Sequence, residues 1–192
     1  LSNEDLYLIR KIFGELMGVK DIGFKSPWEK PGYQDDFLIR ADKNPNSRGA
    51  EEMGLTSDVR TILESTGAGR IKVLYVFQHN FNAPEALELL RDTSVIIYQG
   101  TNWNQTAERA HVVLTSATYA EKDGTFTNFE GRIQRFRRAV PPLEESKTDF
   151  EILSLLAERL EYPLVYSDPG DLYMEWRGQS YEEMDPYGEM LG

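Results

Sequence analysis

Residues 71–117 read IKVLYVFQHNFNAPEALELLRDTSVIIYQGTNWNQTAERAHVVLTSA, and this stretch decides the fold. It alternates three short apolar runs with two runs in which apolar residues recur at helical spacing, the helices beginning at Pro84 and near Gln105. The apolar runs, which we expect to be strands, are residues 71–77, 94–98 and 111–117. Strands that are apolar on both faces and joined by helical crossovers predict an α/β fold, with a parallel core over about residues 70–118 buried between helices.

The residues before this core predict two further helices and a long connection between them. An amphipathic helix follows Ser2 or Asn3, either of which is suited to cap it. Residues 20–56 are rich in Asp, Gly, Pro and Asn, and they indicate a long, ordered connection. Thr56 or Ser57 is then expected to cap a short helix that ends at the glycines of STGAGR.

The segment after the core, residues 119–142, reads YAEKDGTFTNFEGRIQRFRRAVPP and is locally basic. It predicts two short extended pieces around Gly124 and Gly131, with arginines interleaved among apolar residues as on an edge strand. The apolar side chains expected to point inward are Phe126, Phe129, Ile133 and Phe136. Thr148 and Glu151 then form a capping box for a helix that we expect to cover a face of the sheet.

The carboxyl-terminal part of the chain carries an uneven share of the charge. Residues 168–192 hold seven acidic residues against one basic residue, whereas residues 119–138 hold five basic and three acidic residues. This asymmetry suits contact between the two segments or with another subunit, although two solvated faces of opposite sign explain it equally well. Because residues 163–192 also contain several prolines and glycines, we predict an irregular, extended and partly disordered acidic tail after a domain over residues 1–162.

The composition of the 192-residue chain excludes several kinds of site and partner. It has no cysteine and only two histidines, which excludes disulfides, cysteine-ligated zinc and iron–sulfur clusters held by this chain. A formal net charge of −11 argues against nucleic acid as a partner, because phosphate binding relies on a dense basic face. Without an apolar run of about eighteen residues or a signal peptide pattern, the sequence predicts a soluble, cytoplasmic chain with no membrane insertion.

Three parallel strands with two helical crossovers make a Rossmann-like, three-layer half, in which ligands bind beyond the carboxyl ends of the strands. This rule nominates the short polar loops after the three strands, at residues 78–80, 99–101 and 115–117. The candidate cofactor-binding residues in these loops are Gln78, His79, Asn80, Gly100, Thr101 and Thr115. None of the loops has a GxGxxG or Walker A pattern, so a nicotinamide dinucleotide of the usual kind is not expected.

Each of the two histidines has a catalytic and a structural interpretation. His79 lies in a loop where a ligand is expected, but no second histidine or cysteine is near it in the sequence. A hydrogen-bonded loop histidine is therefore favoured over a general base or a metal ligand. His111 opens a buried strand and is interpreted as a structural residue, so the sequence predicts no catalytic residue and no metal ligand.

Two parts of the sequence resemble a known family. Residues 110–142, AHVVLTSATYAEKDGTFTNFEGRIQRFRRAVPP, followed by DFEILSLLAERL, are similar to the signature of the molybdopterin oxidoreductases, in which an apolar strand leads into AxxEKxGTFTNxEGRVQR. Within that superfamily, LSNEDLYLIRKIF at residues 1–13 and DDFLIRADKNPNSRGAEEMGL at residues 35–55 resemble the large iron–sulfur subunit of bacterial NADH-quinone oxidoreductase (complex I). The resemblance spans most of residues 1–162.

The resemblance implies an inner domain like that of formate dehydrogenase and DMSO reductase, in a chain that is a fragment of a longer one. As part of the large complex I subunit it implies a structural domain without a redox centre of its own, which supports electron transfer from NADH to quinone through iron–sulfur clusters of the parent chain. The implied partners are the cluster-binding part of the same chain and other subunits, in the peripheral arm of a membrane-bound complex. No cofactor is then expected in the fragment itself.

The alternative is a segment of a molybdenum or tungsten oxidoreductase, such as formate dehydrogenase, that binds molybdopterin guanine dinucleotide. In relatives with that cofactor, the loops nominated above hold its phosphates and guanosine. Gln78 stands where such relatives have glycine, so its side chain is expected to obstruct a pyrophosphate, and His111 replaces an aspartate that pairs with guanine. A third hypothesis, a free-standing nucleotide-binding module, is disfavoured because the loops lack phosphate-binding glycines.

Overall fold

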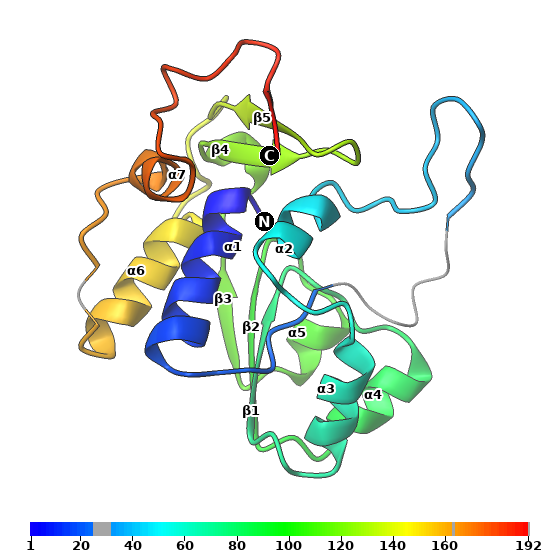
Figure 1. Cartoon of the computed structure of the whole chain (residues 1–192). Coiled ribbons are helices and arrows are strands. Elements are labelled where there is room, and N and C mark those ends of the chain that lie inside the picture. Colours follow the sequence, from blue (N-terminus) through cyan, green and yellow to red (C-terminus); the bar gives the residue numbers. More distant parts are fainter. Residues whose placement is uncertain (25–31, 163, 192) are drawn as a thin grey trace.

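The computed structural model describes residues 1–24, 32–162 and 164–191, and its central element is a parallel three-stranded sheet. The strands are β1 (Val73–Phe77), β2 (Val95–Gly100) and β3 (Val112–Thr115), with β2 in the middle. Val73 is paired with Val95 across β1 and β2, and Ile97 with Val112 across β2 and β3. The predicted α/β fold with a parallel core is confirmed, and helices flank the sheet on both sides (Figure 1).

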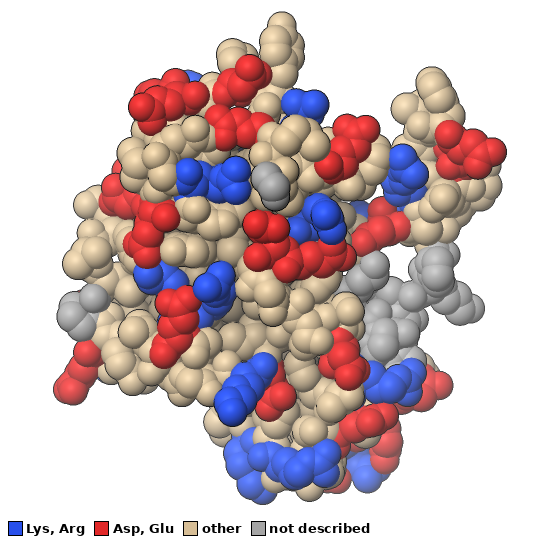
Figure 2. Space-filling view, in the orientation of Figure 1, with Lys and Arg blue, Asp and Glu red and all other residues tan. Residues whose placement is uncertain are grey.

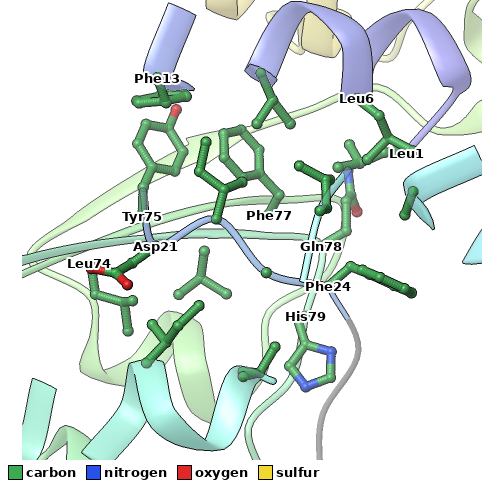
Figure 3. Close-up of a pocket in the computed structure, with 18 of the residues that line it drawn as sticks. Leu1, Leu6, Phe13, Asp21, Phe24, Leu74, Tyr75, Phe77, Gln78 and His79 are labelled. Atoms are coloured by element: carbon green, nitrogen blue, oxygen red, sulfur yellow. The ribbon is translucent and has the colours of Figure 1, made fainter. Parts of the chain in front are cut away.

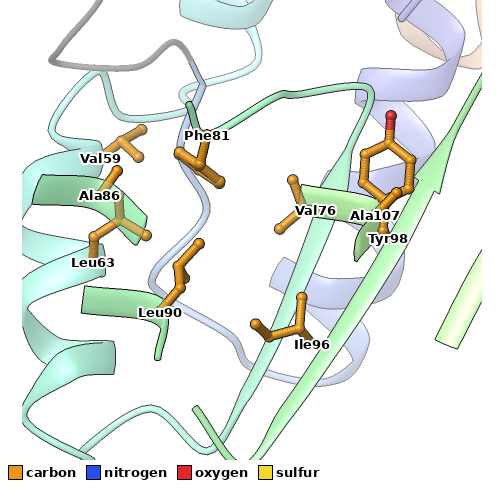
Figure 4. Close-up of a cluster of buried hydrophobic side chains, with 9 residues drawn as sticks. All are labelled: Val59, Leu63, Val76, Phe81, Ala86, Leu90, Ile96, Tyr98 and Ala107. Carbon is orange, nitrogen blue, oxygen red and sulfur yellow. The ribbon is translucent and has the colours of Figure 1, made fainter. Parts of the chain in front are cut away.

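One face of the sheet is covered by three short helices. They are α3 (Val59–Gly67), α4 (Pro84–Leu90) and α5 (Gln105–Arg109). Their buried side chains form one apolar cluster with Val76 of β1 and with Ile96 and Tyr98 of β2 (Figure 4). Leu63 of α3 and Leu90 of α4 are at most 1% exposed, so these helices hold this face of the sheet by close apolar packing.

The start of α4 agrees with its local sequence signal, whereas the cap of α3 differs from the predicted one. Pro84 lies in the first turn of α4, as the sequence predicts. The cap of α3 is Asp58, and not Thr56 or Ser57. The two carboxylate oxygens of Asp58 accept hydrogen bonds from the N–H and the hydroxyl of Thr61, at 3.2 and 2.7 Å, so this side chain satisfies more groups than a hydroxyl cap does.

The opposite face of the sheet is covered by the first helix and by α6. The helices on this side are α1 (Asn3–Ile9), its π-helical continuation η1 (Arg10–Leu16), the short α2 (Ser47–Glu52) beside α1, and α6 (Asp149–Arg159). Leu8, Ile12 and Leu153 are fully buried in the cluster between α1, η1 and α6. Ser2, one of the two predicted candidates, caps α1. Thr148 and Glu151 form the predicted capping box of α6, which lies against the sheet as expected.

The outer strands are less buried than their sequences suggest. Val112 and Val113 of β3 are 44% and 38% exposed, and Val73 of β1 is 55% exposed. In the described part of the chain, β1 and β3 each have a neighbouring strand on one side only. An apolar run does not distinguish an outer strand from a central one, so the prediction of burial on both faces is wrong at these positions.

A second, smaller sheet is antiparallel and lies at the top of Figure 1. Its strands, in spatial order, are β4 (Gly124–Thr127), β5 (Arg132–Phe136) and β6 (Glu189–Met190). The two predicted extended pieces are β4 and β5, but the predicted inward residues are only partly right. Ile133 is fully buried, whereas Phe129 is 58% exposed and Phe126 stacks on Phe136 with ring centroids 4.5 Å apart.

The buried side chains of β4 are those of its two threonines, because polar side chains of α1 reach them. The Glu4 carboxylate accepts hydrogen bonds from the N–H and the hydroxyl of Thr125, at 2.9 and 2.7 Å. Nδ2 of Asn3 donates to Oγ1 of Thr125 and of Thr127, each at 3.0 Å. Burial raises the pKa of Glu4 above its ordinary value, although the bonds from Thr125 oppose that shift. Buried polar groups are tolerated here because each has a partner on the neighbouring element.

The prediction of an extended, partly disordered tail is wrong for residues 169–177, which form α7 (Pro169–Arg177). Leu172 and Tyr173 of α7 are 1% and 0% exposed, and the helix packs against α1 (Figure 1). Asp168 caps α7, with Pro169 in its first turn. Because Asp and Pro are favoured at helix starts, these two residues mark a beginning and not a break in structure. The division of the chain at residue 162 stays a prediction.

Arg135 of β5 joins the basic segment to the acidic one. Its Nη1 lies 3.6 Å from Oε1 of Glu182, and its guanidinium lies over the ring of Tyr181 at 4.3 Å from the centroid. Contact between the two segments is thus confirmed for this residue, and β5 is the central strand of its sheet and not an edge. Figure 2 shows a group of basic side chains at the lower end of this face, with acidic and basic side chains interspersed over the rest of it.

Candidate functional site

The loops after the three parallel strands meet at the carboxyl end of the sheet, where the side chain of Gln78 joins them. Its Nε2 donates a hydrogen bond to Oγ of Ser116, after β3, at 2.6 Å. Its Oε1 accepts a hydrogen bond from the N–H of Thr101, after β2, at 3.3 Å. We call Gln78, Thr101 and Ser116 the strand-end cluster. Two of its members are candidates from the sequence, and the third, Ser116, stands next to the candidate Thr115.

Gln78 has a backbone conformation that glycine adopts more readily than other residues. Its φ is +55°, and its N–H donates to the carbonyl of Gln99 at 2.7 Å. In this left-handed region a residue with a Cβ is less stable than glycine by about 1–2 kcal/mol. The position where the family resemblance places glycine therefore keeps a glycine-like backbone, with a glutamine side chain added to it.

The candidates in the second and third loops lie around this cluster. Gly100 is buried, and a Cβ there would lie 2.2 Å from the hydroxyl of Tyr98. That hydroxyl donates to the carbonyl of Asn102 at 3.1 Å, and burial raises the pKa of Tyr98. Thr115 is exposed and pairs with Gly100 across β2 and β3, and among the described residues its side chain makes no hydrogen bond to the cluster. Gly100 is therefore required for the turn over Tyr98, whereas Thr115 borders the site.

The candidates in the first loop differ in how their polar atoms are satisfied. Oδ1 of Asn80 is buried and has no hydrogen-bond partner among the described residues. The ring of His79 packs edge-on against Phe81, with centroids 4.5 Å apart, and its predicted hydrogen bond stays a prediction. His111 makes the predicted kind of structural contact, because its Nδ1 accepts a hydrogen bond from the N–H of Ile96 at 3.0 Å, but it is exposed and precedes β3 instead of opening a buried strand.

An apolar pocket of about 600 Å³ runs along β1 beside the strand-end cluster (Figure 3). Leu6 of α1 and Phe13 of η1 line it together with every residue of β1. In Figure 3, Gln78 and His79 lie toward one end of the pocket, away from Phe13. Its lining offers few polar groups, so the strand-end cluster, and not this pocket, is the candidate site for a polar ligand.

A buried ion cluster lies between the sheet, α1 and α6. Nζ of Lys122, whose side chain is 6% exposed, lies 2.5 Å from Oδ2 of Asp5 and 2.5 Å from Oδ2 of Asp149. Oδ1 of Asp149 accepts a hydrogen bond from Nε2 of Gln99 at 2.6 Å, and Oε1 of Gln99 accepts one from the hydroxyl of Tyr75 at 2.7 Å. This chain of contacts connects the antiparallel and parallel parts of the fold through one lysine.

Lys122 and Asp5 of the ion cluster are charged at neutral pH, because each holds the pKa of the other on the charged side. Burial alone lowers the pKa of Lys122, but the two carboxylates outweigh burial and hold that pKa above its ordinary value. Burial alone raises the pKa of Asp5, but the Lys122 ammonium holds it below its ordinary value. Because every charge faces an opposite one, the cluster has the properties of a structural element. The sequence signal for it was the EKDGTFTN block, in which Lys122 stands.

Metal ligands and membrane spans are not found in the parts of the chain that the structure describes. No three or more His, Cys, Asp or Glu side chains are arranged there to hold a metal ion. No helix there is long and apolar enough to cross a bilayer. The strand-end cluster itself is made of hydroxyl, amide and carboxamide groups.

Comparisons with known proteins place this chain in a family. The sequence model for molybdopterin oxidoreductases matches residues 24–159. A putative formate dehydrogenase of Bacillus subtilis is 31% identical over 191 residues, which cover 92% of this chain and 19% of that protein. The alpha subunit of an F420-dependent formate dehydrogenase of Methanocaldococcus jannaschii is 34% identical over 176 residues, which cover 80% of this chain and 25% of that protein.

A solved structure shows the same fold at lower sequence identity. Acetylene hydratase from Pelobacter acetylenicus superposes with a TM-score of 0.54 at 21% identity, over 64% of this chain and 19% of that chain.

These comparisons show the family of the chain but not the activity of the whole protein. The chain spans 19% and 25% of the two formate dehydrogenases, so the activity of a whole protein does not follow from the match. The relatives described above are named formate dehydrogenases and not subunits of NADH-quinone oxidoreductase, so they do not support the finer resemblance to the large complex I subunit. With the family match covering residues 24–159, well over half of its length, the chain belongs to the molybdopterin oxidoreductase family.

Proposed function

We propose that this chain is the nucleotide-binding segment of a molybdenum or tungsten oxidoreductase of the formate dehydrogenase type. In the parent protein, the loops of the strand-end cluster hold the guanosine and phosphate end of molybdopterin guanine dinucleotide. The observation that carries the proposal is the convergence of polar groups from all three loops at the carboxyl edge of the parallel sheet, where open α/β sheets bind ligands. The formate dehydrogenases that match most of this chain support it.

The groups at this edge fit the nucleotide end of such a cofactor in their hydrogen-bonding chemistry. The N–H of Thr101 and the hydroxyl of Ser116 are donors of the kind that phosphate oxygens accept from. The buried Oδ1 of Asn80, which has no partner among the described residues, is an acceptor for an amino or hydroxyl group of the ligand. Gly100 presents backbone without a side chain. Among the described residues at this edge, the side chain of Gln78 competes with the ligand for these groups.

In this proposal the segment binds and orients the cofactor, and the cofactor supplies the redox chemistry. When bound, the cofactor supplies the redox metal centre of the reaction. Thr101, Ser116 and Asn80 would fix the nucleotide end through hydrogen bonds, and the buried sheet behind them would hold these groups in place. The partners in this proposal are the remainder of the parent chain, including a part that binds iron–sulfur clusters, and other subunits that carry electrons.

A second candidate function is a structural domain without a cofactor, in the large iron–sulfur subunit of an NADH-quinone oxidoreductase. The observation that favours it is the Gln78 side chain, which already makes hydrogen bonds to Thr101 and Ser116 at the strand ends. In that role the domain packs the cluster-bearing part of its chain against neighbouring subunits. The two candidates share a family and a fold, and they differ in whether a ligand fills this edge.

The substitution Asn80→Leu tests the proposed site in protein purified from its native host. Because Oδ1 of Asn80 has no partner among the described residues, we expect the free energy of unfolding to change by less than about 0.5 kcal/mol. Guanine nucleotide released by acid and measured by chromatography is expected to fall roughly tenfold, the effect of one lost hydrogen bond to the ligand.

The matched control is Asn82→Leu, at an exposed asparagine two residues along the same loop. This variant is expected to keep the wild-type amount of nucleotide. If both variants retain nucleotide equally well, the ligand does not lie at this edge.

A further inference from the structure

We infer that the side chain of Gln78 is an internal competitor for the phosphate position at the strand ends. The carboxamide belongs to the chain itself, carries no charge, and occupies hydrogen-bonding groups that a nucleotide phosphate needs. The inference rests on the proposed function and deepens it, because it names the residue that sets the affinity of the site for its ligand.

The contacts of the carboxamide place it where a phosphate oxygen would lie. Oε1 of Gln78 accepts from the N–H of Thr101 at 3.3 Å and lies 3.4 Å from the Thr101 hydroxyl. Nε2 donates to Oγ of Ser116 at 2.6 Å. A phosphate oxygen bound to the N–H of Thr101 would take the position of Oε1, so the side chain and the ligand exclude each other there.

The backbone of Gln78 shows that the turn itself still suits a ligand. Its φ of +55° lies in the region that glycine occupies freely. The obstruction is therefore the side chain alone, attached by rotatable bonds and held by two hydrogen bonds between uncharged groups. Hydrogen bonds to a charged phosphate are stronger than such neutral bonds, so the ligand displaces the carboxamide at a reduced affinity. The side chain of Gln78 therefore lowers the affinity of the site for the nucleotide without abolishing binding.

A control for backbone effects is available within the chain. Glu161, just after α6, has a φ of +62° and is exposed. Replacing Glu161 by glycine relieves the same kind of backbone conformation as Gln78→Gly does, and in Figure 1 the carboxyl end of α6 lies well away from the carboxyl ends of the strands. The pair of glycine variants therefore separates the loss of the carboxamide from the gain of a glycine.

The experiment measures GDP binding by isothermal titration calorimetry to the purified wild-type protein and to the Gln78→Gly, Gln78→Ala and Glu161→Gly variants. We expect Gln78→Gly to bind GDP about tenfold more tightly than the wild type, since two neutral hydrogen bonds no longer compete. Gln78→Ala is expected to bind more tightly as well, and Glu161→Gly to equal the wild type. Without GDP, hydrogen exchange at the amide of Thr101 is expected to be at least tenfold faster in Gln78→Ala than in the wild type.

The outcomes distinguish the inference from the proposed function on which it rests. If GDP binds, two results would overturn the role of Gln78 and leave the nucleotide site standing. One is unchanged hydrogen exchange at Thr101 in Gln78→Ala, and the other is equal GDP affinity in the wild type and all three variants. Faster exchange at Thr101 with no GDP binding by any of the four proteins would overturn the nucleotide site, although the carboxamide contact exists. The expected pattern, with faster exchange and tighter binding confined to the Gln78 variants, supports both.

Discussion

Replacing Lys122 by methionine is expected to lower the free energy of unfolding by about 3–5 kcal/mol at pH 7. Methionine has a similar length and no charge, so the carboxylates of Asp5 and Asp149 remain buried without the ammonium between them. An unpaired buried charge destabilises a fold far more than the loss of a surface ion pair does. Urea denaturation followed by circular dichroism measures the loss.

Two further variants show that the loss comes from the ion cluster. Lys72→Met removes an exposed lysine and is expected to change the free energy of unfolding by less than about 0.5 kcal/mol. Adding Asp5→Asn and Asp149→Asn to Lys122→Met is expected to recover a large part of the stability, because no buried charge then remains unpaired. An effect of Lys122→Met no larger than that of Lys72→Met would mean that the cluster does not form in solution.

The same cluster sets a pH dependence. The lowered pKa of Asp5 contributes stability above the unfolded value of about 3.9, and that contribution is lost as the pH falls through the folded-state value. The raised pKa of Lys122 contributes stability below the unfolded value of about 10.4, and that contribution is lost as the pH rises through the folded-state value. The difference between wild type and Lys122→Met is therefore expected to be largest between about pH 5 and pH 9.

Leu172→Ala in α7 is expected to lower the free energy of unfolding by about 2–5 kcal/mol. Leu172 is 1% exposed and packs in one cluster with Leu8 of α1 and Leu153 of α6, so its removal leaves a cavity between three helices. Guanidinium denaturation of the two proteins measures the difference. The acidic segment would then be shown to belong to the core of the domain.

The matched control is Met174→Ala on the same helix, where the side chain is 44% exposed. This change is expected to lower the free energy of unfolding by less than about 1 kcal/mol. Equal and small effects of the two substitutions would contradict the packing of α7 against α1.

The parallel core could be predicted from the sequence because its signals are local. Alternating apolar strands and helical runs, Pro84 at a helix start and the capping box of Thr148 and Glu151 each depend on residues within a few positions of one another. The burial of Thr125 depends instead on Glu4, 121 residues away, and no pattern within β4 reveals that contact. Acidic composition predicts a tail at α7, but the local cap at Asp168 and the packing of Leu172 decide for a helix.

The meeting of the three loops could be predicted from the sequence, but the contacts between their side chains could not. The topology of parallel strands brings the three loops together, so Gln78 and Thr101 could be nominated without a structure. The family resemblance also implies that the side chain of Gln78 obstructs a pyrophosphate. It does not show that the carboxamide bonds to Thr101 and Ser116, because side-chain direction at a positive φ depends on the turn in three dimensions. Thr115 was nominated where its neighbour Ser116 makes the contact.

The most direct test of the proposed function is the molybdenum and tungsten content of the parent protein, purified from its native host and measured by elemental mass spectrometry. The proposed function predicts a stoichiometric amount of one of the two metals, together with fluorescent pterin and guanine nucleotide released by acid. Protein that contains neither metal and no pterin, from cells supplied with both molybdate and tungstate, would contradict it and favour the structural domain of an NADH-quinone oxidoreductase.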